Sequence, residues 1–272
     1  GVERAVRMAK EAAERAKGKV YSYGQLVHNR LVVEHLRGLG IEPLEEISPD
    51  VPRRGDVLII RAHGAPPEVF REMAGRGVEV VDTTCPIVKE ARGKAMALMG
   101  EGYEVIIVGD GGHPEVKGIV GCLEGRAKVV RGASEAKRMD LPPKVGVVAQ
   151  TTESLDELAE VVSAVLPRVR ELKVVNTICG AVIRRQQEVE KLAKECEVVV
   201  VVGGKNSANT RRLAGIASKF CPNVIHIEEP SELDKVRIPR EVRCVGVSGG
   251  TSTPRESVDE VVWKLQRILK GV

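Results

Sequence analysis

Four apolar runs in this chain each end in a glycine-containing polar turn that leads into a stretch with helical periodicity. They lie within residues 57–68, 105–116, 198–210 and 245–256. Glycine lets the backbone approach a ligand closely, and the free amides and dipole of a following helix attract anions. The repetition therefore predicts several loops that bind one small polyanion, with phosphate as the expected group.

Short β-branched runs alternate with amphipathic helical stretches along nearly the whole chain. Strands are expected at 19–23, 56–61, 78–82, 104–108, 127–130, 145–149, 172–176, 197–202, 223–227 and 242–247. Such alternation is typical of an α/β fold with parallel sheets. No linker or low-complexity segment marks a boundary, so a domain division has to come from internal similarity.

Two segments of the sequence resemble each other. VEVVDTTCP (78–86) and LKVVNTICG (172–180) both give an apolar strand, then Asp or Asn, Thr, any residue and Cys. Ligands of open parallel sheets bind at the carboxyl ends of strands, and a thiolate at a helix N-terminus suits metal ligation or nucleophilic chemistry. Cys85 and Cys179 are therefore candidate functional groups, with a structural role as the alternative. Their spacing suggests a division into units 1–84, 85–177 and 178–272.

The other cysteines lie in or beside apolar runs, and we expect each to be a small buried residue. They are Cys122, Cys196, Cys221 and Cys244. Disulfides in a chain of this length would require an oxidising compartment. No CxxC pair is present, which argues against a zinc ribbon.

Composition excludes several classes of function. The 42 basic and 38 acidic residues are evenly spread and only 2% of the chain is aromatic, so a nucleic-acid groove with stacking side chains is not expected. No apolar run approaches the roughly 20 residues of a membrane span, and no signal pattern opens the chain. We expect a globular cytoplasmic protein.

Three of the five histidines lie in a loop directly before a helical run: His28, His63 and His113. Imidazoles in this position can bind phosphate or supply protons, and a structural cap is the alternative. Glu115 follows shortly after His113. It is either a first-turn acid that complements the helix dipole or a buried proton donor.

The motifs VHNRLVVEHL, RAHG, DTTCP, GHPEVKG, QTT, NTIC, GGKNSANTRRL and GGTSTP follow one another in this order. Together they closely resemble the 4-hydroxy-3-methylbut-2-enyl diphosphate reductase family, the LytB or IspH type, over the whole chain. The resemblance implies a trefoil of three α/β units, with mostly parallel sheets, around a central cavity. It also implies an iron-sulfur oxidoreductase of isoprene biosynthesis that removes an allylic hydroxyl to give isopentenyl and dimethylallyl diphosphate.

The same resemblance implies roles for individual residues. Cys85 and Cys179 match two ligands of a [4Fe-4S] cluster, and the third ligand is expected upstream of Gly1, because the opening GVERA matches the residues that follow the family's first cysteine. Without that cysteine we expect no stable cluster. Glu115 matches the proton donor, acting with Thr151 and His113. The diphosphate-binding positions match His28, His63, His113, Thr151, Ser207, Asn209 and Ser252.

One position departs from the family pattern. Ala208 stands where related sequences often have a second serine, which removes one phosphate hydrogen bond worth about 1–3 kcal/mol. The expected partners are the allylic diphosphate and a ferredoxin or flavodoxin as electron donor, with no nucleic acid and no membrane. Two other readings remain open: a metal-free phosphate-binding α/β module, and a degenerate, inactive homologue.

Overall fold

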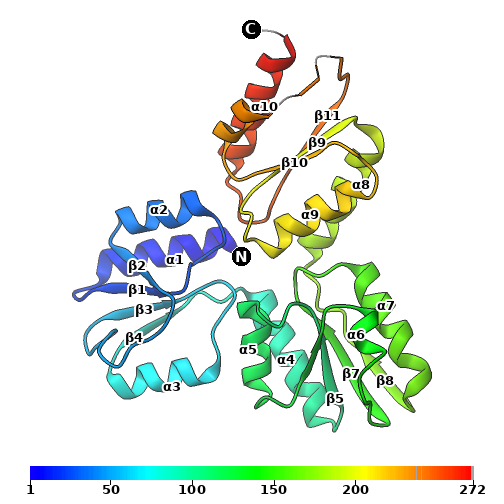
Figure 1. The fold of residues 1–272 in the computed structure, drawn as a ribbon. Coiled ribbons are helices and arrows are strands. Elements are labelled where there is room, and N and C mark those ends of the chain that lie inside the picture. Colours follow the sequence, from blue (N-terminus) through cyan, green and yellow to red (C-terminus); the bar gives the residue numbers. More distant parts are fainter. Residues whose placement is uncertain (237, 240, 271–272) are drawn as a thin grey trace. The chain divides into compact units, whose positions relative to one another are not determined.

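The computed structural model describes residues 1–236, 238–239 and 241–270. Its strands form three separate sheets, each built from its own stretch of the chain and flanked by its own helices (Figure 1). All pairings between the named strands are parallel. The expected α/β fold class with parallel sheets is confirmed.

The first sheet has the strand order β2-β1-β3-β4. Its elements are α1 (Val2–Arg15), β1 (Val20–Tyr23), α2 (Arg30–Gly38), β2 (Ile41–Leu44), β3 (Val57–Ile60), α3 (Pro67–Arg76) and β4 (Glu79–Asp82). Leu58 and Ile60 of the fully buried β3 pack with Val69 and Met73 of α3. The sequence did not predict β2, because Pro43 cannot donate to a ladder and is tolerated only on an edge strand such as this one.

The second sheet has the order β6-β5-β7-β8. Its elements are α4 (Pro86–Gly100), β5 (Glu104–Val108), α5 (Pro114–Cys122), β6 (Lys128–Val130), α6 (Ala133–Ala136), β7 (Lys144–Ala149), α7 (Leu155–Val165), a 3-10 turn (Leu166–Arg168) and β8 (Glu171–Val174). Leu98 of α4 and Ile119 of α5 pack in one core cluster with Val105 and Ile107 of β5. This packing fixes the start of α5, which carries candidate site residues.

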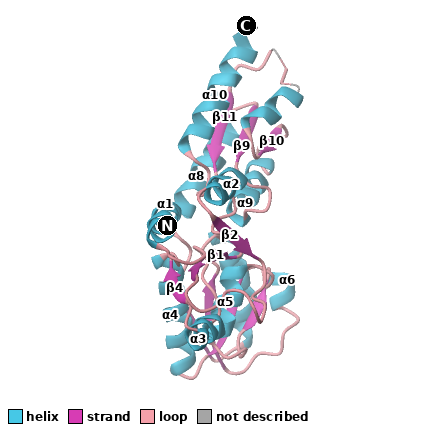
Figure 2. Cartoon of the chain, turned by 90° about the vertical axis from the view of Figure 1, so that its left-hand side faces the viewer, coloured by secondary structure: helices cyan, strands magenta, loops and turns pink. Residues whose placement is uncertain are grey.

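The third sheet has the order β10-β9-β11. Its elements are α8 (Gly180–Glu195), β9 (Val198–Val202), α9 (Ala208–Ser218), β10 (Val224–Ile227), a 3-10 helix (Pro230–Lys235), β11 (Val245–Gly249) and α10 (Arg255–Lys270). The five valines of β9 are all buried because both faces of the strand are covered. Val199 and Val201 pack against α8 and α9, whereas Val198, Val200 and Val202 pack against α10. Figure 2 shows α10 running alongside these strands.

The chain separates into two compact units. Unit 1 consists of residues 1–27 and 33–179 and contains the first two sheets, and unit 2 consists of residues 28–32 and the chain from Gly180 onward. The expected division at 84/85 and 177/178 places one sheet in each part and stays a prediction. Among the described residues, no helix combines the length and apolar character needed to cross a membrane.

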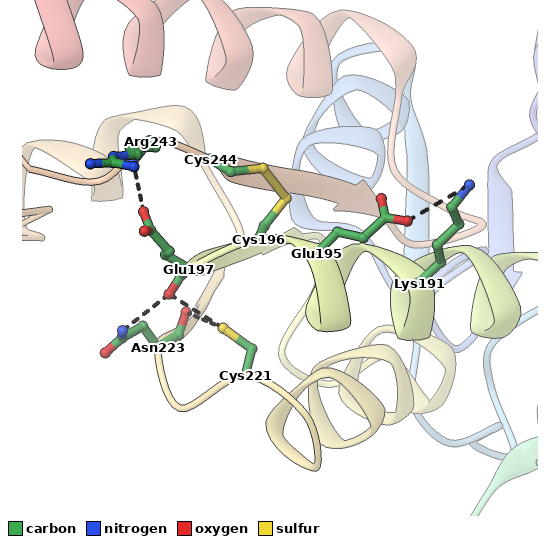
Figure 3. Close-up of a disulfide and its surroundings, with 8 residues drawn as sticks. All are labelled: Lys191, Glu195, Cys196, Glu197, Cys221, Asn223, Arg243 and Cys244. Carbon is green, nitrogen blue, oxygen red and sulfur yellow. Dashed lines mark hydrogen bonds and ion pairs between the residues drawn. A yellow bond between two sulfur atoms is a disulfide. The ribbon is translucent and has the colours of Figure 1, made fainter.

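The cysteines outside the repeated motif differ from expectation. Cys196, directly after α8, and Cys244, directly before β11, form a disulfide with their Cα atoms 4.8 Å apart (Figure 3). The expectation that both are buried hydrophobic residues was therefore wrong. The two residues are 48 positions apart and meet only because β11 pairs with β9, a pairing that local sequence does not encode. Cys122 is only half-buried, whereas Cys221 is buried as expected.

Candidate active site

The two repeated motifs adopt the same local structure in unit 1. The hydroxyl of Thr83 donates to the carbonyl of Ile60 at the end of β3 (2.6 Å), and the hydroxyl of Thr177 donates to the carbonyl of Ala149 at the end of β7 (2.5 Å). All four groups are buried. Each threonine thus fastens its motif to the neighbouring strand, which gives the sequence repeat a structural reason.

Each motif cysteine is also fastened to the turn that follows the neighbouring strand. The amide of Cys85 donates to the carbonyl of Ala62, and the amide of Cys179 donates to the carbonyl of Thr151, both at 2.9 Å. Cys85 is the N-cap of α4, and Cys179 directly precedes α8. Both thiols are free and half-buried. The turns that contain His63 and Thr151 are therefore held next to the two cysteines.

Thiolates at helix N-termini are suitable ligands for an iron-sulfur group, so the donor chemistry of Cys85 and Cys179 fits the cofactor that the family resemblance implies. The first residue of the chain lies against one of them. A Cβ built on Gly1 would stand 2.9 Å from the sulfur of Cys85. The guanidinium of Arg4 donates to the carbonyl of Thr84 (3.2 Å), which ties the start of α1 to the same motif.

Glu115, in the first turn of α5, is the most deeply buried ionisable group of the candidate site, with 1% of its surface exposed. One carboxylate oxygen accepts the amide of Thr151 (2.6 Å) and the other accepts its hydroxyl (2.7 Å). Burial raises the pKa of Glu115, opposed by the hydrogen bonds from Thr151 and the charge of Arg92. The sequence left two alternatives for Glu115, a first-turn acid that complements the helix dipole and a buried proton donor. The structure places it in the first turn of α5 and also buries it, as a proton donor would require.

His113 is the N-cap of α5. Its ring Nδ1 accepts a hydrogen bond from the amide of Glu115 (3.2 Å), so a neutral ring carries its proton on Nε2. The ring of His63 meets that of His113 edge-on, with 5.0 Å between their centroids. Unit 1 therefore gathers two imidazoles, a buried carboxyl and the hydroxyl of Thr151.

A second group of expected site residues lies in unit 2. Ser207 is the N-cap of α9, and its hydroxyl accepts the amide of Thr210 (3.3 Å). Ser252 donates to the carbonyl of His28 (3.3 Å). Gly204, in the turn after β9, lies so close to this carbonyl that a Cβ there would stand 2.5 Å from it. The turns after β9 and β11 are thus both packed against His28.

Asn209 is the polar group of unit 2 that most clearly lacks a partner. Its side chain is 2% exposed, and within the described part of the chain neither its amide nitrogen nor its oxygen has a hydrogen-bond partner. An unsatisfied buried amide costs about 1–3 kcal/mol, so such groups are rare in the absence of a ligand. The first turn of α9 is therefore suited to bind a polar ligand, which fits the expected phosphate.

The chain is an α/β protein of parallel sheets, with thiols, imidazoles and hydroxyls in turns at the carboxyl ends of its strands. Proteins of this class bind their ligands at that edge of the sheet. The family model described as LytB protein matches residues 1–266. The chain belongs to the LytB family.

Curated relatives and solved structures agree with this assignment. The chain is 41% identical to the 4-hydroxy-3-methylbut-2-enyl diphosphate reductase of Aquifex aeolicus over 100% of this chain and 93% of the relative. It is 43% identical to the reductase of the same name from Geobacter sulfurreducens, over 98% and 93%.

Two solved structures are also similar. One, of (E)-4-hydroxy-3-methyl-but-2-enyl diphosphate reductase, described as the terminal enzyme of the non-mevalonate pathway, matches with a TM-score of 0.68 and 40% identity over 98% of this chain and 94% of that chain. The E-1-hydroxy-2-methyl-but-2-enyl-4-diphosphate reductase of Plasmodium falciparum matches with a TM-score of 0.91 and 26% identity, over 97% and 84%.

Proposed function

We propose that this chain reduces 4-hydroxy-3-methylbut-2-enyl diphosphate by removing its allylic hydroxyl. The carbon–oxygen bond breaks, two electrons and two protons are consumed, and water leaves with isopentenyl or dimethylallyl diphosphate as the product. Membership of the LytB family and the identity to curated reductases over nearly the whole chain support this function. The buried pair of Glu115 and Thr151 is the structural observation that carries it.

Within this proposal Cys85 and Cys179 hold an iron-sulfur cluster of the [4Fe-4S] type. When bound, the cluster supplies Lewis acidity toward the hydroxyl oxygen and the two electrons for the reduction. A cluster of this kind normally takes further thiolates, and the backbone of Gly1 lies against Cys85. The electron donor is a ferredoxin or flavodoxin, and the enzyme acts in the cytoplasm, where the disulfide of Cys196 and Cys244 is an exception to the usual reduced state of thiols.

Glu115 holds the proton that the leaving hydroxyl needs. Because burial raises its pKa, the carboxyl stays protonated to higher pH than an exposed glutamate does. The hydroxyl of Thr151, 2.7 Å from the carboxyl oxygen, can accept this proton and donate its own onward. His113, with its proton on Nε2, supplies a further donor beside the pair.

The diphosphate is bound by neutral donors and helix N-termini. The proposed contacts are the positions that match the family's diphosphate-binding residues: His28, His63, His113, Thr151, Ser207, Asn209 and Ser252. Hydrogen bonds to a charged group are about twice as strong as neutral ones, and helix N-termini attract phosphate. The unsatisfied amide of Asn209 supports this assignment most directly.

Glu115→Gln tests the proposal. The substitution keeps the shape of the side chain but leaves no proton to transfer. In the chain extended to include an upstream cysteine, we therefore expect bound iron and substrate affinity to persist while turnover falls by about 10²-fold or more. Glu68→Gln is the matched control, since Glu68 also lies in the first turn of a helix but is exposed. Normal turnover of Glu115→Gln in an anaerobic assay with a chemical reductant would remove Glu115 from the mechanism.

Iron and sulfide analysis after anaerobic reconstitution separates the reductase from the other two functions. Little iron in a chain extended to include an upstream cysteine, together with binding of inorganic diphosphate, would favour a metal-free phosphate-binding module. Loss of both properties would favour a degenerate homologue.

A further inference from the structure

Arg92 of α4 connects two parts of the candidate site, and the sequence motifs give no indication of this role. Its guanidinium donates from Nη1 to the carbonyl of Ala65 (3.1 Å) and from Nη2 to the carbonyl of His63 (3.3 Å). Both carbonyls belong to the turn between β3 and α3. Because the guanidinium is a rigid planar fork, two donated bonds fix the orientation of this turn as well as its distance from α4.

The space around the guanidinium is provided by glycines on two different elements. Gly64 of the same turn and Gly118 of α5 both lie so close that a Cβ at either position would overlap Arg92. Gly64 also has a φ of +81°, in the left-handed region that glycine adopts without strain. The His63 turn and the helix that carries Glu115 are therefore both packed against the same charged group.

Arg92 also acts on the site through its charge. The ionisable groups that face it are Asp82 at the end of β4 and both Glu115 and Cys122 of α5. Burial raises the pKa of Glu115, and the positive charge of Arg92 opposes this rise. Thr151 donates to the carboxyl of Glu115, and His113 accepts the backbone amide of the same residue. The Nε of Arg92 is buried without a hydrogen-bond partner among the described residues, so the side chain is held by its two terminal nitrogens and by packing.

We propose that Arg92 is a positioning residue of the reductase site, whose guanidinium holds the His63 turn against α5 and Glu115. It does not touch the substrate in this role. The effect of Arg92 on catalysis rests on the proposed function. Its role in holding the His63 turn against α5 concerns unit 1 alone and does not depend on that function. Loss of the two hydrogen bonds from the guanidinium should make the His63 turn more mobile, and loss of its positive charge should raise the pKa of Glu115.

Two substitutions separate these effects. Arg92→Lys keeps the charge but loses the fork, and Arg92→Gln loses both. In hydrogen–deuterium exchange of the metal-free protein, we expect the peptide covering residues 61–70 to exchange about tenfold faster in both variants. In ¹³C NMR of the Glu115 carboxyl, we expect a higher pKa in Arg92→Gln and an unchanged one in Arg92→Lys. Lys94→Gln is the control, since it removes a charge from an exposed position of the same helix.

Steady-state kinetics of the same variants provide a third measurement. In the loaded enzyme we expect kcat/KM to fall about tenfold in Arg92→Lys, with KM carrying most of the change, because the turn binds substrate while the carboxyl keeps its titration. Arg92→Gln should in addition move the limb on which kcat falls with rising pH to higher pH, because Glu115 then keeps its proton longer. Both exchange and titration are independent of turnover, so an inactive wild type would contradict the proposed function and leave this test in force.

Wild-type exchange and an unchanged Glu115 titration in Arg92→Gln would overturn the role of Arg92. The same changes in Lys94→Gln would overturn it too, because they would reflect the charge of α4 in general. If Arg92→Gln does not fold, Arg92→Lys and Gly118→Ala decide the question by exchange alone. Gly118→Ala displaces the guanidinium from its place and should reproduce the faster exchange, whereas slow exchange in both would contradict the proposal.

Discussion

Thr151 donates two hydrogen bonds to Glu115, one from its amide at 2.6 Å and one from its hydroxyl at 2.7 Å. The carbonyl of the same threonine accepts the amide of Cys179. One residue therefore links the buried carboxyl of α5 to a motif cysteine. The proposed proton donor and a proposed cluster ligand are fastened to the same turn after β7, which explains how an acid on one helix can be aligned with a thiol on another segment.

Thr151→Ala should lower turnover more than it lowers stability. The backbone bond to Glu115 remains, while the hydroxyl that accepts and passes the proton is lost. We expect kcat to fall about 10²-fold, in the range of general acid catalysis, and Thr151→Ser to restore most of it. Steady-state kinetics of the reconstituted enzyme check this, and equal activity of the Ala and Ser variants would show that the hydroxyl carries no proton.

The pH dependence of stability should report the burial of Glu115. Its pKa is raised above the ordinary 4.5 by burial, so in the folded state it binds a proton more tightly than in the unfolded state. Its contribution to the free energy of unfolding is therefore fully present below pH 4.5 and is lost as the pH rises through the folded-state pKa. Urea unfolding of wild type and Glu115→Gln should show the wild type losing stability relative to the variant as the pH rises, and parallel curves would contradict this.

Asn209 should matter for ligand binding and little for folding. Its buried amide has no partner among the described residues, so Asn209→Ala removes no hydrogen bond that this structure contains. We expect the affinity for inorganic diphosphate to fall about tenfold or more and the midpoint of urea unfolding to change little. Calorimetric titration measures the first effect. Asn223→Ala, at an exposed position, is the control and should bind diphosphate normally.

The disulfide of Cys196 and Cys244 should make unit 2 sensitive to reductant. It closes a loop with a sequence separation of 48, for which loop-closure entropy gives a stabilisation of about 4 kcal/mol as an upper figure. We expect the thermal midpoint of the wild type to fall by several degrees in excess dithiothreitol. The double variant Cys196→Ser, Cys244→Ser should show the lower midpoint with and without reductant, and an equal response to reductant would exclude the disulfide as its cause.

Bound iron should depend on the two motif cysteines. In the chain extended to include an upstream cysteine, Cys85→Ser and Cys179→Ser are each expected to abolish iron binding after anaerobic reconstitution, whereas Cys221→Ser, which alters a buried core thiol, should retain it. Because Gly1 lies against the sulfur of Cys85, an extension that carries a cysteine ahead of Gly1 should raise the iron content. Iron and sulfide assays with absorption spectra check both points, and iron retained in Cys85→Ser would refute the ligand assignment.

The fold class, nearly all the strands and the family can be predicted from the amino-acid sequence. These are local properties of the chain. A run of β-branched residues such as Val198–Val202 favours a buried strand, and a motif such as DTTCP is recognised from a few consecutive residues. The sequence also indicated that Cys85 and Cys179 are equivalent. The structure adds the reason, because the threonines of both motifs bond to the neighbouring strands.

Contacts between residues far apart in the sequence depend on how the helices and strands pack, and the sequence did not predict them. The environment of Glu115 depends on Thr151, which lies in the turn after β7, far from Glu115 in the sequence. The pairing of Cys196 with Cys244 depends on the pairing of β9 with β11. Arg92 carries no local signal, since its partners in the His63 turn and α5 are brought to it by packing. The strand β2 was not predicted because it contains Pro43, and a proline is compatible with a strand only at the edge of a sheet. That β2 is an edge strand is itself a property of the tertiary structure.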